Sequence, residues 1–427
     1  MPLDVVSVRA QFPIFTQKVD GHPLVYLDSA ATSQKPLKVL EAMQKFYEED
    51  NANVKRGMHA LAERATEVYE ATRSRVQHFL HAPCPHEIIF TKNATEGINL
   101  VARSWGENFL KKGDIVLLSL LEHHSNIVPW LQLKQRIGIE VEWISIDPDG
   151  TLNMDDLNEK LRSGKVKLVA LTCVSNVLGV ITPFKEVTAL AHKHGALCLL
   201  DAAQLVSHHP IDVQDLDCDF LVFSGHKVYG PTGIGVLFGK EEHLRVMPPF
   251  LGGGSMIQEV HRTTFTAADL PEKFEAGTPP IAEARGLHAA LDWLENIGWE
   301  TIRAEEQKLL AYALEKLSAL PFIEVLGPKD ARKIMSCISF VTQIPSDPVR
   351  IDVTELRGIH PHDLTDYMGK KGVCLRAGHH CTQPLHRFLR HPATTRLSVG
   401  VYNTENDIDA MCTILQEGYD FFTGQTS

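Results

Sequence analysis

The sequence predicts an α/β protein in which a large, doubly wound domain is joined to a smaller α+β domain. From about residue 25 to 290, short apolar runs alternate with amphipathic helical patterns. After about residue 298 this alternation gives way to one long helical pattern followed by separate strands. A chain of 427 residues that is 44% hydrophobic can bury a large core, and its length suits two or three domains.

The strands of the large domain are predicted at apolar runs, because continuous apolarity indicates burial on both faces and is typical of parallel strands. The clearest runs are DIVLLS (114–119), KLVALT (167–172), ALCLLD (196–201) and DFLVFS (219–224). Helices are predicted between such runs. One covers residues 36–49 and begins with proline, and another covers residues 183–195, beginning with proline and ending at glycine.

The smaller domain is predicted from a long amphipathic helix around residues 300–318. Strands are then expected over SCISFVT (336–342) and VCLRAG (373–378). We therefore expect a large domain over residues 25–295. Residues 1–24 and 296–427 are expected to form the smaller one, with the N-terminal segment packed on it.

Composition narrows the classes of partner and the compartment. The 42 basic and 53 acidic residues give a net charge of −11, which argues against a nucleic-acid partner. The N-terminus has no continuous apolar core and no other stretch approaches a membrane span, so neither export nor membrane insertion is expected. The eight cysteines form no CxxC pair, which predicts a cytoplasmic protein without disulfides and without a metal site. The HxH in GIHPHDL (358–364) is expected to cap a helix.

Polar residues follow the predicted strands at the edge where α/β proteins bind ligands. They are His123, Asn176, Asp201, Ser224, His226 and Lys227. Each alone has an ordinary explanation, because an aspartate at a strand end often caps a helix and a loop lysine is usually solvated. Together they match what pyridoxal phosphate needs: a carboxylate for its ring nitrogen, an amine for a Schiff base, and a Ser/His pair for its phosphate.

Lys227, within FSGHKVYGPTGIG (223–235), is open to four interpretations. It could be a surface charge, a phosphate ligand, a nucleic-acid contact or a nucleophilic amine, and the acidic net charge disfavours the third. A second phosphate site is predicted where a helix begins at Thr95-Glu96-Gly97, since free N–H groups there attract anions. A plain capping box explains the same residues equally well. No GxxxxGK[ST] motif is present, so a nucleoside triphosphate site is not expected.

A set of stretches in order along nearly the whole chain resembles a known family. They are YLDSAATSQKP (26–36), RGMH (56–59), TEGINLVA (95–102), EHHSNIVPW (122–130), VSNVLG (174–179), DAAQ (201–204), FSGHKVYGPTGIG (223–235), GGGSMI (252–257), FEAGTP (274–279) and RAGHHCTQP (376–384). On these stretches the chain resembles the fold-type I, class V aminotransferases, and within them the SUF-type cysteine desulfurases and selenocysteine lyases. The resemblance implies a pyridoxal-phosphate transferase fold with a mostly parallel, mixed sheet in its large domain.

The resemblance also implies roles for single residues. Lys227 corresponds to the Schiff-base lysine, and His123 to the residue that stacks on the pyridine ring and can move protons. Asp201 corresponds to the partner of the ring nitrogen. The other implied cofactor contacts are Asn176 and Gln204 near the phenolic oxygen, and Thr95, Glu96, Ser224 and His226 around the phosphate.

Other matches concern the subunit contact and the substrate. In the family, the residue matching Thr278 reaches the phosphate of the other subunit, which implies a homodimer. Arg396 corresponds to the arginine that binds the substrate carboxylate, with Arg376 and Asn176 expected beside it. GGGSMI (252–257) is either a flexible loop or a substrate contact. The sequence departs from the family at Lys55, where histidine is common, so the substrate contact of that histidine is not carried over.

Cys381 is the predicted nucleophile. A free cysteine is usually a small buried hydrophobe, and that explains the cysteines in apolar runs. Cys381 instead lies in a polar loop beside Arg376, His379 and His380, which favour the thiolate. The resemblance implies that this thiol faces a cofactor held by the other domain.

The expected reaction is the conversion of L-cysteine to L-alanine. Sulfur would pass as a persulfide on Cys381 to a SUF-type acceptor protein for iron–sulfur cluster assembly. His123, whose imidazole has a pKa suited to proton transfer, would protonate the leaving sulfur or the carbon. The alternatives are a selenocysteine lyase, another pyridoxal-phosphate lyase, or a protein that binds the cofactor without catalysis. The presence of both Lys227 and Cys381 argues against the last.

Overall fold

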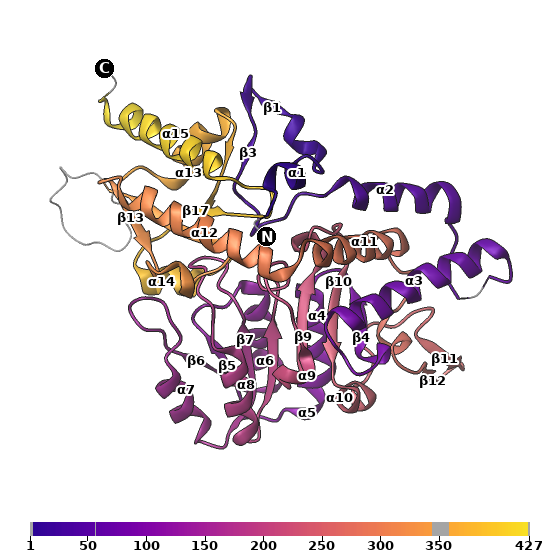
Figure 1. The fold of residues 1–427 in the computed structure, drawn as a ribbon. Coiled ribbons are helices and arrows are strands. Elements are labelled where there is room, and N and C mark those ends of the chain that lie inside the picture. The colour runs from indigo at the N-terminus through magenta and orange to yellow at the C-terminus, as the bar shows by residue number, and fades with distance from the viewer. Residues whose placement is uncertain (1–2, 56, 344–357, 426–427) are drawn as a thin grey trace.

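The computed structural model describes residues 3–55, 57–343 and 358–425, and its centre is a seven-stranded sheet (Figure 1). In spatial order the strands are β4 (Ile88–Thr91), β10 (Gly235–Gly239), β9 (Phe220–Ser224), β8 (Leu197–Asp201), β7 (Val166–Thr172), β5 (Ile115–Ser119) and β6 (Glu140–Ile144). β10 runs antiparallel to both of its neighbours, and the other adjacent pairs are parallel. The prediction of a mostly parallel, mixed sheet is confirmed.

Both faces of this sheet are covered, which explains why its strands are continuously apolar. Leu117 packs into the core on one face, whereas its neighbours Val116 and Leu118 pack into the core on the other. The first face is covered by α3 (Ala60–Phe79), α8 (Phe184–Lys193) and α11 (Ile281–Ile297), and the second by α4 (Ala94–Leu100) and α6 (Val128–Ile137).

The two helices predicted from proline starts are present. Pro36 is the N-cap of α2 (Leu37–Lys45), which continues as a π-helical turn, and Pro183 is the N-cap of α8. The remaining short elements are α5 (Glu107–Phe109), α7 (Met154–Leu161), α9 (Val213–Leu216), α10 (Glu241–Val246), the β1–β2 hairpin (Lys18–Val19 and His22–Pro23) and the β11–β12 hairpin (Ile257–Val260 and Phe265–Ala267).

A second sheet, of four antiparallel strands, lies toward the C-terminal part of the chain. Its order is β13 (Ile323–Leu326), β14 (Cys337–Thr342), β17 (Thr394–Ser398) and β16 (Arg376–Gly378). The surrounding helices are α12 (Trp299–Ser318), α13 (Pro361–Lys370), α14 (Gln383–Leu389) and α15 (Glu405–Thr423). Phe340, Leu397 and Met411 belong to a separate core within this unit. His360 caps α13 by accepting a hydrogen bond from the His362 N–H, as the sequence predicted.

The strand predicted over residues 373–378 is divided between two sheets. β15 (Val373–Cys374) pairs in parallel with β3 (Val25–Tyr26), and only β16 joins the four-stranded sheet. Val25 and Leu27 therefore pack in the core of the smaller unit. We propose a domain boundary after about residue 28 in place of the predicted boundary at residue 25.

The N-terminal segment also packs on the smaller unit. In α1 (Val5–Arg9), the guanidinium of Arg9 donates to the carbonyl of Tyr402 and to the carboxylate of Asp407. Within the residues that the structure describes, no helix combines the length and the apolar character needed to cross a membrane.

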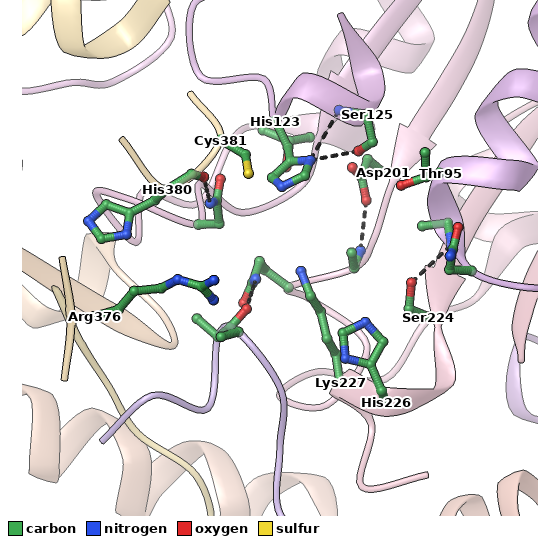
Figure 2. Close-up of a pocket in the computed structure, with 18 of the residues that line it drawn as sticks. Thr95, His123, Ser125, Asp201, Ser224, His226, Lys227, Arg376, His380 and Cys381 are labelled. Atoms are coloured by element: carbon green, nitrogen blue, oxygen red, sulfur yellow. Dashed lines mark hydrogen bonds between the residues drawn. The ribbon is translucent and has the colours of Figure 1, made fainter. Parts of the chain in front are cut away.

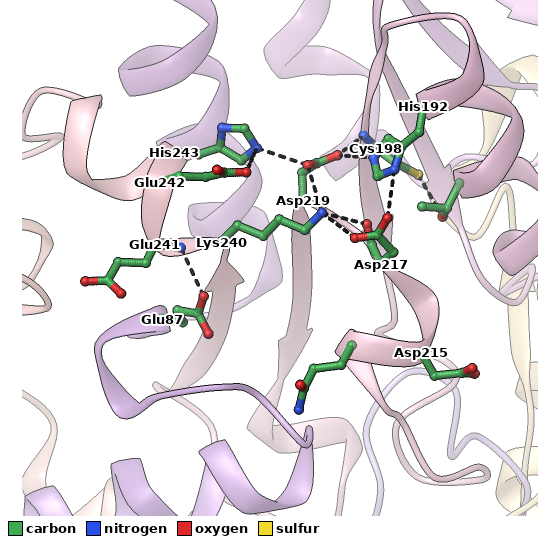
Figure 3. A network of polar contacts seen from close by, with 12 residues as sticks. Glu87, His192, Cys198, Asp215, Asp217, Asp219, Lys240, Glu241, Glu242 and His243 are labelled. Atoms are coloured by element: carbon green, nitrogen blue, oxygen red, sulfur yellow. Dashed lines mark hydrogen bonds and ion pairs between the residues drawn. The ribbon is translucent and has the colours of Figure 1, made fainter.

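A polar network fixes the large sheet at the edge where β8 and β9 begin (Figure 3). The buried carboxylate of Asp219 accepts hydrogen bonds from the backbone N–H of Cys198 at 2.8 Å and from the rings of His192 and His243 at 2.8 and 3.0 Å. Burial opposes the charge, but these donors hold the pKa of Asp219 at about 2. At their opposite ends, β8 finishes at Asp201 and β9 leads into the turn that carries Lys227. The network therefore helps to set the positions of Asp201 and Lys227 relative to each other.

Candidate active site

A cavity of about 230 Å³ lies at the carboxyl ends of the large sheet, and residues of both units line it (Figure 2). The lining includes most of the residues predicted from the sequence, namely Thr95, His123, Asn176, Asp201, Gln204, Ser224, His226, Lys227, Arg376, Cys381 and Arg396. Glu96 and Thr278 line a different cavity, together with Tyr69 and Phe90. The Glu96 carboxylate accepts from the Lys92 N–H, and its own N–H donates to the Asn93 side chain, so it belongs to the helix cap.

Lys227 ends a short 3₁₀ turn that follows β9. The glycine-rich sequence after it is explained by close backbone packing. A Cβ on Gly235 would lie 2.5 Å from the Cα of Asn93, so only glycine lets β10 pass beside the start of α4. Burial lowers the pKa of Lys227 to about 8, although Asp201 opposes the shift. The amine therefore spends more of its time neutral and nucleophilic than an exposed lysine does.

The carbonyl oxygen of His226, which precedes Lys227, accepts four hydrogen bonds. They come from the Ser33 N–H (3.0 Å), the Ser33 hydroxyl (3.1 Å), the Thr32 hydroxyl (3.1 Å) and the Lys35 Nζ (3.0 Å). Burial lowers the pKa of Lys35 to about 7. In the sequence, the only signal for Lys35 is its place in the YLDSAATSQKP stretch.

Asp201 ends β8 inside the sheet edge. Its carboxylate accepts from the Ala203 N–H at 3.0 Å, and burial raises its pKa. A second carboxyl group, that of Glu122, lies close enough to Asp201 to interact with its charge. Glu122 is fully buried and accepts hydrogen bonds from the Ser119 hydroxyl at 2.5 Å and from the Thr172 N–H at 3.0 Å. Burial raises the pKa of Glu122 to about 8, so it is largely protonated at neutral pH. No local pattern in the sequence marks Glu122 for a role in the site.

The imidazole of His123 is fixed in one orientation. Its Nδ1 accepts from the Ser125 N–H at 3.1 Å and lies 2.8 Å from the Ser125 hydroxyl, which leaves the proton on Nε2. Burial, with a further contribution from the charge of Lys227, lowers the pKa of His123 to about 3. His123 is therefore a neutral ring near pH 7 that offers one N–H.

The predicted phosphate end of the cavity combines hydroxyl and backbone donors. The Ser224 hydroxyl accepts from the Ala94 N–H at 2.9 Å, which ties the end of β9 to the first turn of α4. Thr95 and His226 line the cavity beside it. Burial lowers the pKa of His226 to about 4, so this ring is also neutral near pH 7.

Cys381 lies on a tight turn of the smaller unit, and hydrogen bonds from the large unit hold this turn in place. His380 and Cys381 both have positive φ, at 48° and 60°, an uncommon conformation for residues other than glycine. The His124 N–H donates to the carbonyl of Cys381 at 2.7 Å, and the side-chain amide of Asn176 donates to the carbonyl of His380 at 2.7 Å. The result is an exposed thiol that also lines the cavity.

Two arginines line the cavity on neighbouring strands, since Arg376 on β16 pairs with Arg396 on β17. Arg396 is 2% exposed, and it donates to the carbonyl of Asn176 at 2.8 Å and to the carboxylate of Asp28 at 2.9 Å. Its Nε has no hydrogen-bond partner among the described residues. Two guanidinium groups at one corner of the cavity favour an anionic ligand such as a carboxylate.

The donor set fits pyridoxal phosphate. The cavity offers an amine of lowered pKa, a buried carboxylate, a flat neutral imidazole, and hydroxyl and backbone donors at a helix start. Lys55 is not among the lining residues, because its Nζ forms ion pairs with Glu272 and Glu70. Over the described parts of the chain, no cluster of His, Cys, Asp and Glu side chains is arranged to hold a metal ion.

Comparison with known proteins is consistent along the whole chain. Residues 25–411 match the family described as aminotransferase class-V. A probable cysteine desulfurase of Synechocystis sp. is 45% identical, with 99% of this chain and 97% of the relative covered. The crystal structure of the Escherichia coli cysteine desulfurase CsdA has a TM-score of 0.87 at 37% identity, covering 99% and 100% of the two chains. An apo cysteine desulfurase of Thermococcus onnurineus has a TM-score of 0.90 at 36% identity, covering 99% of each chain.

Proposed function

The chain belongs to the class V aminotransferases and, within them, to the pyridoxal-phosphate-dependent cysteine desulfurases, and from this premise we propose how its residues divide the work. The observation that carries the proposal is that Lys227, Asp201 and Cys381 line one cavity although they come from two structural units. An amine, a carboxylate and a thiol in one cavity meet the needs of a reaction that passes through a lysine-bound cofactor and a cysteine nucleophile.

We propose that Lys227 and Asp201 hold the two ends of the cofactor ring and that His123 packs on its face. Asn176 and Gln204 would lie at the phenolic oxygen, and the phosphate cradle would be formed by Thr95, Ser224 and His226. When bound, pyridoxal phosphate supplies an electron sink for negative charge at the substrate Cα. The buried carboxylate of Asp201 favours a protonated ring nitrogen, because a cation beside it offsets the cost of its burial.

The chain's own residues then act on L-cysteine. Arg396, with Arg376, binds the substrate carboxylate, and the Lys227 amine takes the Cα proton. The Cys381 thiolate attacks the substrate sulfur: the new S–S bond forms as the Cβ–S bond breaks, and the electron pair of the broken bond stays with carbon, which takes up a proton. L-cysteine and the Cys381 thiol thereby become L-alanine and a persulfide on Cys381. The neutral Nε2–H of His123 serves as a hydrogen-bond donor in these steps.

The persulfide must next leave the enzyme, and the exposure of Cys381 supports transfer to another protein. We propose a SUF-type acceptor and a role in iron–sulfur cluster assembly, in keeping with the resemblance to that group. The abundance of unpaired cysteines supports a cytoplasmic setting.

We also propose that the active unit is a homodimer. Thr278 lies outside its own chain's cavity, in a separate hollow lined by aromatic residues such as Phe250 and by charged residues such as Glu283, and a second copy could contact it there. Mixing a Lys227→Ala chain with a Thr278→Ala chain tests this proposal. If Thr278 serves the other subunit, mixed dimers contain one site that lacks both groups and one intact site, so activity should recover above that of either variant.

The decisive experiment is the Cys381→Ser variant. Its alanine release from L-cysteine should fall at least about 100-fold, because the substrate sulfur loses its nucleophile while cofactor binding remains. Visible absorbance of the bound cofactor and trapping of the Lys227 adduct with borohydride provide the control for an intact site. Alanine release that survives in Cys381→Ser would contradict the proposal.

Selenocysteine separates this function from its nearest alternative. Selenide is a better leaving group than sulfide, so its release should persist in Cys381→Ser. A wild-type protein that forms alanine from selenocysteine but not from cysteine would be a selenocysteine lyase.

A further inference from the structure

A basic groove lies beside the proposed nucleophile and outside the cavity described above. α14 begins at Gln383, directly after the turn that carries Cys381. The groove has a volume of about 410 Å³ and is lined mainly by His379, Gln383, His386, Arg387, Arg390 and His391. We call it the α14 groove. His379, on its wall, stands next but one to Cys381 in the chain.

Two arginines of the α14 groove have no ion-pair partner in the described part of the chain. Arg387 and Arg390 are exposed, and neither forms an ion pair with any described carboxylate. Some exposed arginines have such a partner, as Arg332 has Asp330 and Arg64 has Asp50, whereas the exposed Arg162 has none among the described residues. Glu324 lies close enough to His391 to favour its protonated form, so the unpaired charge of the groove is that of the two arginines. On a chain of net charge −11, two unpaired arginines on one groove form a local basic patch.

The α14 groove is held rigidly with respect to Cys381. His386 is 2% exposed; its Nδ1 lies 3.1 Å from the Thr382 hydroxyl, and its Nε2 lies 3.2 Å from the Thr394 hydroxyl on β17. The Gln383 N–H donates to the His124 ring at 3.1 Å, which ties the start of α14 to the large unit. A partner bound in the groove would therefore stand in a fixed position beside the thiol.

We propose that the α14 groove binds an acidic surface of the protein that accepts the persulfide sulfur. This inference rests on the proposed function, since it names the chemistry of the acceptor for that reaction. In the transfer, the acceptor thiolate attacks the outer sulfur of the Cys381 persulfide. A new S–S bond forms on the acceptor, the bond between the two sulfurs on Cys381 breaks, and its electron pair returns to Cys381 as a thiolate. Carboxylates beside the acceptor thiol would pair with Arg387 and Arg390 and hold the two thiols together.

The test uses two synthetic peptides that each contain one cysteine, flanked in one by glutamates and in the other by lysines. The holoenzyme is first loaded with L-cysteine, and the rate of persulfide transfer to each peptide is measured. The acidic peptide should react about tenfold faster at low salt, and the difference should shrink as ionic strength rises.

The Arg387→Glu/Arg390→Glu variant should abolish or reverse the preference for the acidic peptide, and Arg387→Gln/Arg390→Gln should reduce it. The matched control is Arg162→Glu/Lys165→Glu, an exposed pair at the end of α7, which should keep the wild-type preference. Alanine release with dithiothreitol as acceptor should be the same in all of these proteins, because the groove residues lie outside the cavity lining.

The outcomes distinguish the two levels of the proposal. Loss of alanine release in the wild type would overturn the proposed function itself. Equal rates for the two peptides, or a preference retained in Arg387→Glu/Arg390→Glu, would overturn the inference alone. So would a short RNA that blocks transfer to both peptides equally, or a change of oligomeric state in the charge-reversed variant, since the groove would then bind nucleic acid or a second copy.

Discussion

The carbonyl oxygen of His226 has two lone pairs and four donors around it, from Thr32, Ser33 and Lys35. One of these donors is a lysine whose amine lies inside the protein, where an amine without acceptors would be costly. Lys35 Nζ is satisfied by the carbonyls of Ser33 and His226, at 2.6 and 3.0 Å. The peptide that leads into Lys227 is thus held by the loop that carries YLDSAATSQKP.

Lys35→Met tests this positioning role. The side chain keeps its volume but loses its donor, so we expect kcat for alanine release to fall about tenfold, with KM for cysteine changed less than about twofold. The absorbance band of the bound cofactor should shift, because the Lys227 backbone is held less firmly. Lys35→Arg should restore part of kcat, and Lys38→Met, on the exposed side of α2, should behave as wild type. Wild-type kcat and spectrum in Lys35→Met would contradict the role.

At the residue scale, the sequence predicted groups that follow strands and missed groups that act through tertiary contacts. Lys227 and Asp201 follow apolar runs, and a sheet brings such positions to one edge whatever else the chain does. Lys35 follows no long apolar run, and its partner His226 lies far along the chain. Glu122 follows the same run as His123, but its role depends on burial and on the remote backbone N–H of Thr172, which no local pattern marks. The low pKa of His123 was likewise hidden, since burial sets it.

At the scale of elements, the segment that carries Thr278 is clamped to α3 and β4 by one carboxylate. The Glu275 carboxylate accepts hydrogen bonds from both terminal nitrogens of Arg73, at 2.7 and 2.8 Å. It also accepts from the Phe90 N–H at 2.8 Å and from the Tyr69 hydroxyl at 2.9 Å. Arg73 is 1% exposed, and its Nε also donates to the carboxylate of Glu70 at 2.9 Å, so its buried charge depends on these two carboxylates.

Glu275→Gln should lower the free energy of unfolding by about 3 kcal/mol, because the buried Arg73 charge then keeps only the partly exposed Glu70 as its partner. Urea denaturation followed by far-UV circular dichroism measures the change. Glu300→Gln, exposed at the start of α12, provides the control and should stay within about 0.5 kcal/mol of wild type. A loss below about 1 kcal/mol would show that water or another group replaces the carboxylate.

Elements were predicted well where their pattern is local and less well where pairing is remote. The strands at 114–119 and 219–224 were found within a residue of their predicted starts, because continuous apolarity reports burial on both faces. The run at 373–378 was predicted as one strand but serves two sheets. The run is divided because β15 pairs with β3, a strand near the N-terminus. No signal in the neighbouring sequence marks so remote a partner.

At the scale of the whole molecule, buried neutral histidines support the turn by which the smaller unit contacts the large one. His380 and His386 are 6% and 2% exposed, and both rings lie within 3.2 Å of the Thr394 hydroxyl. Burial lowers the pKa of His380 to about 2 and that of His386 to about 4, against 6.5 for the free side chain. The turn that carries Cys381 is therefore built around rings that must stay uncharged.

These lowered pKa values make stability dependent on pH with a definite sign. Between pH 6.5 and about 4, the unfolded chain binds protons at these histidines and the folded chain does not, so the stability present above pH 6.5 is lost as the pH falls. Each histidine should lower the free energy of unfolding at pH 5.5 by about 1 kcal/mol relative to its value at pH 7. Glu122, whose pKa is raised to about 8, acts in the opposite direction, because the folded chain binds its proton first as the pH falls.

The His386→Gln variant isolates the histidine contribution, because Glu122 is present in both proteins. We expect the loss of unfolding free energy between pH 7 and pH 5.5 to be about 1 kcal/mol smaller in the holoenzyme of this variant than in the wild type, measured by urea denaturation. Glutamine can still bond the Thr394 hydroxyl, so the change concerns the slope more than the stability at pH 7. His78→Gln, on the exposed face of α3, should leave the slope unchanged. Equal slopes in all three proteins would mean that the His386 ring accepts its proton without unfolding, and that the turn beside Cys381 tolerates a charge.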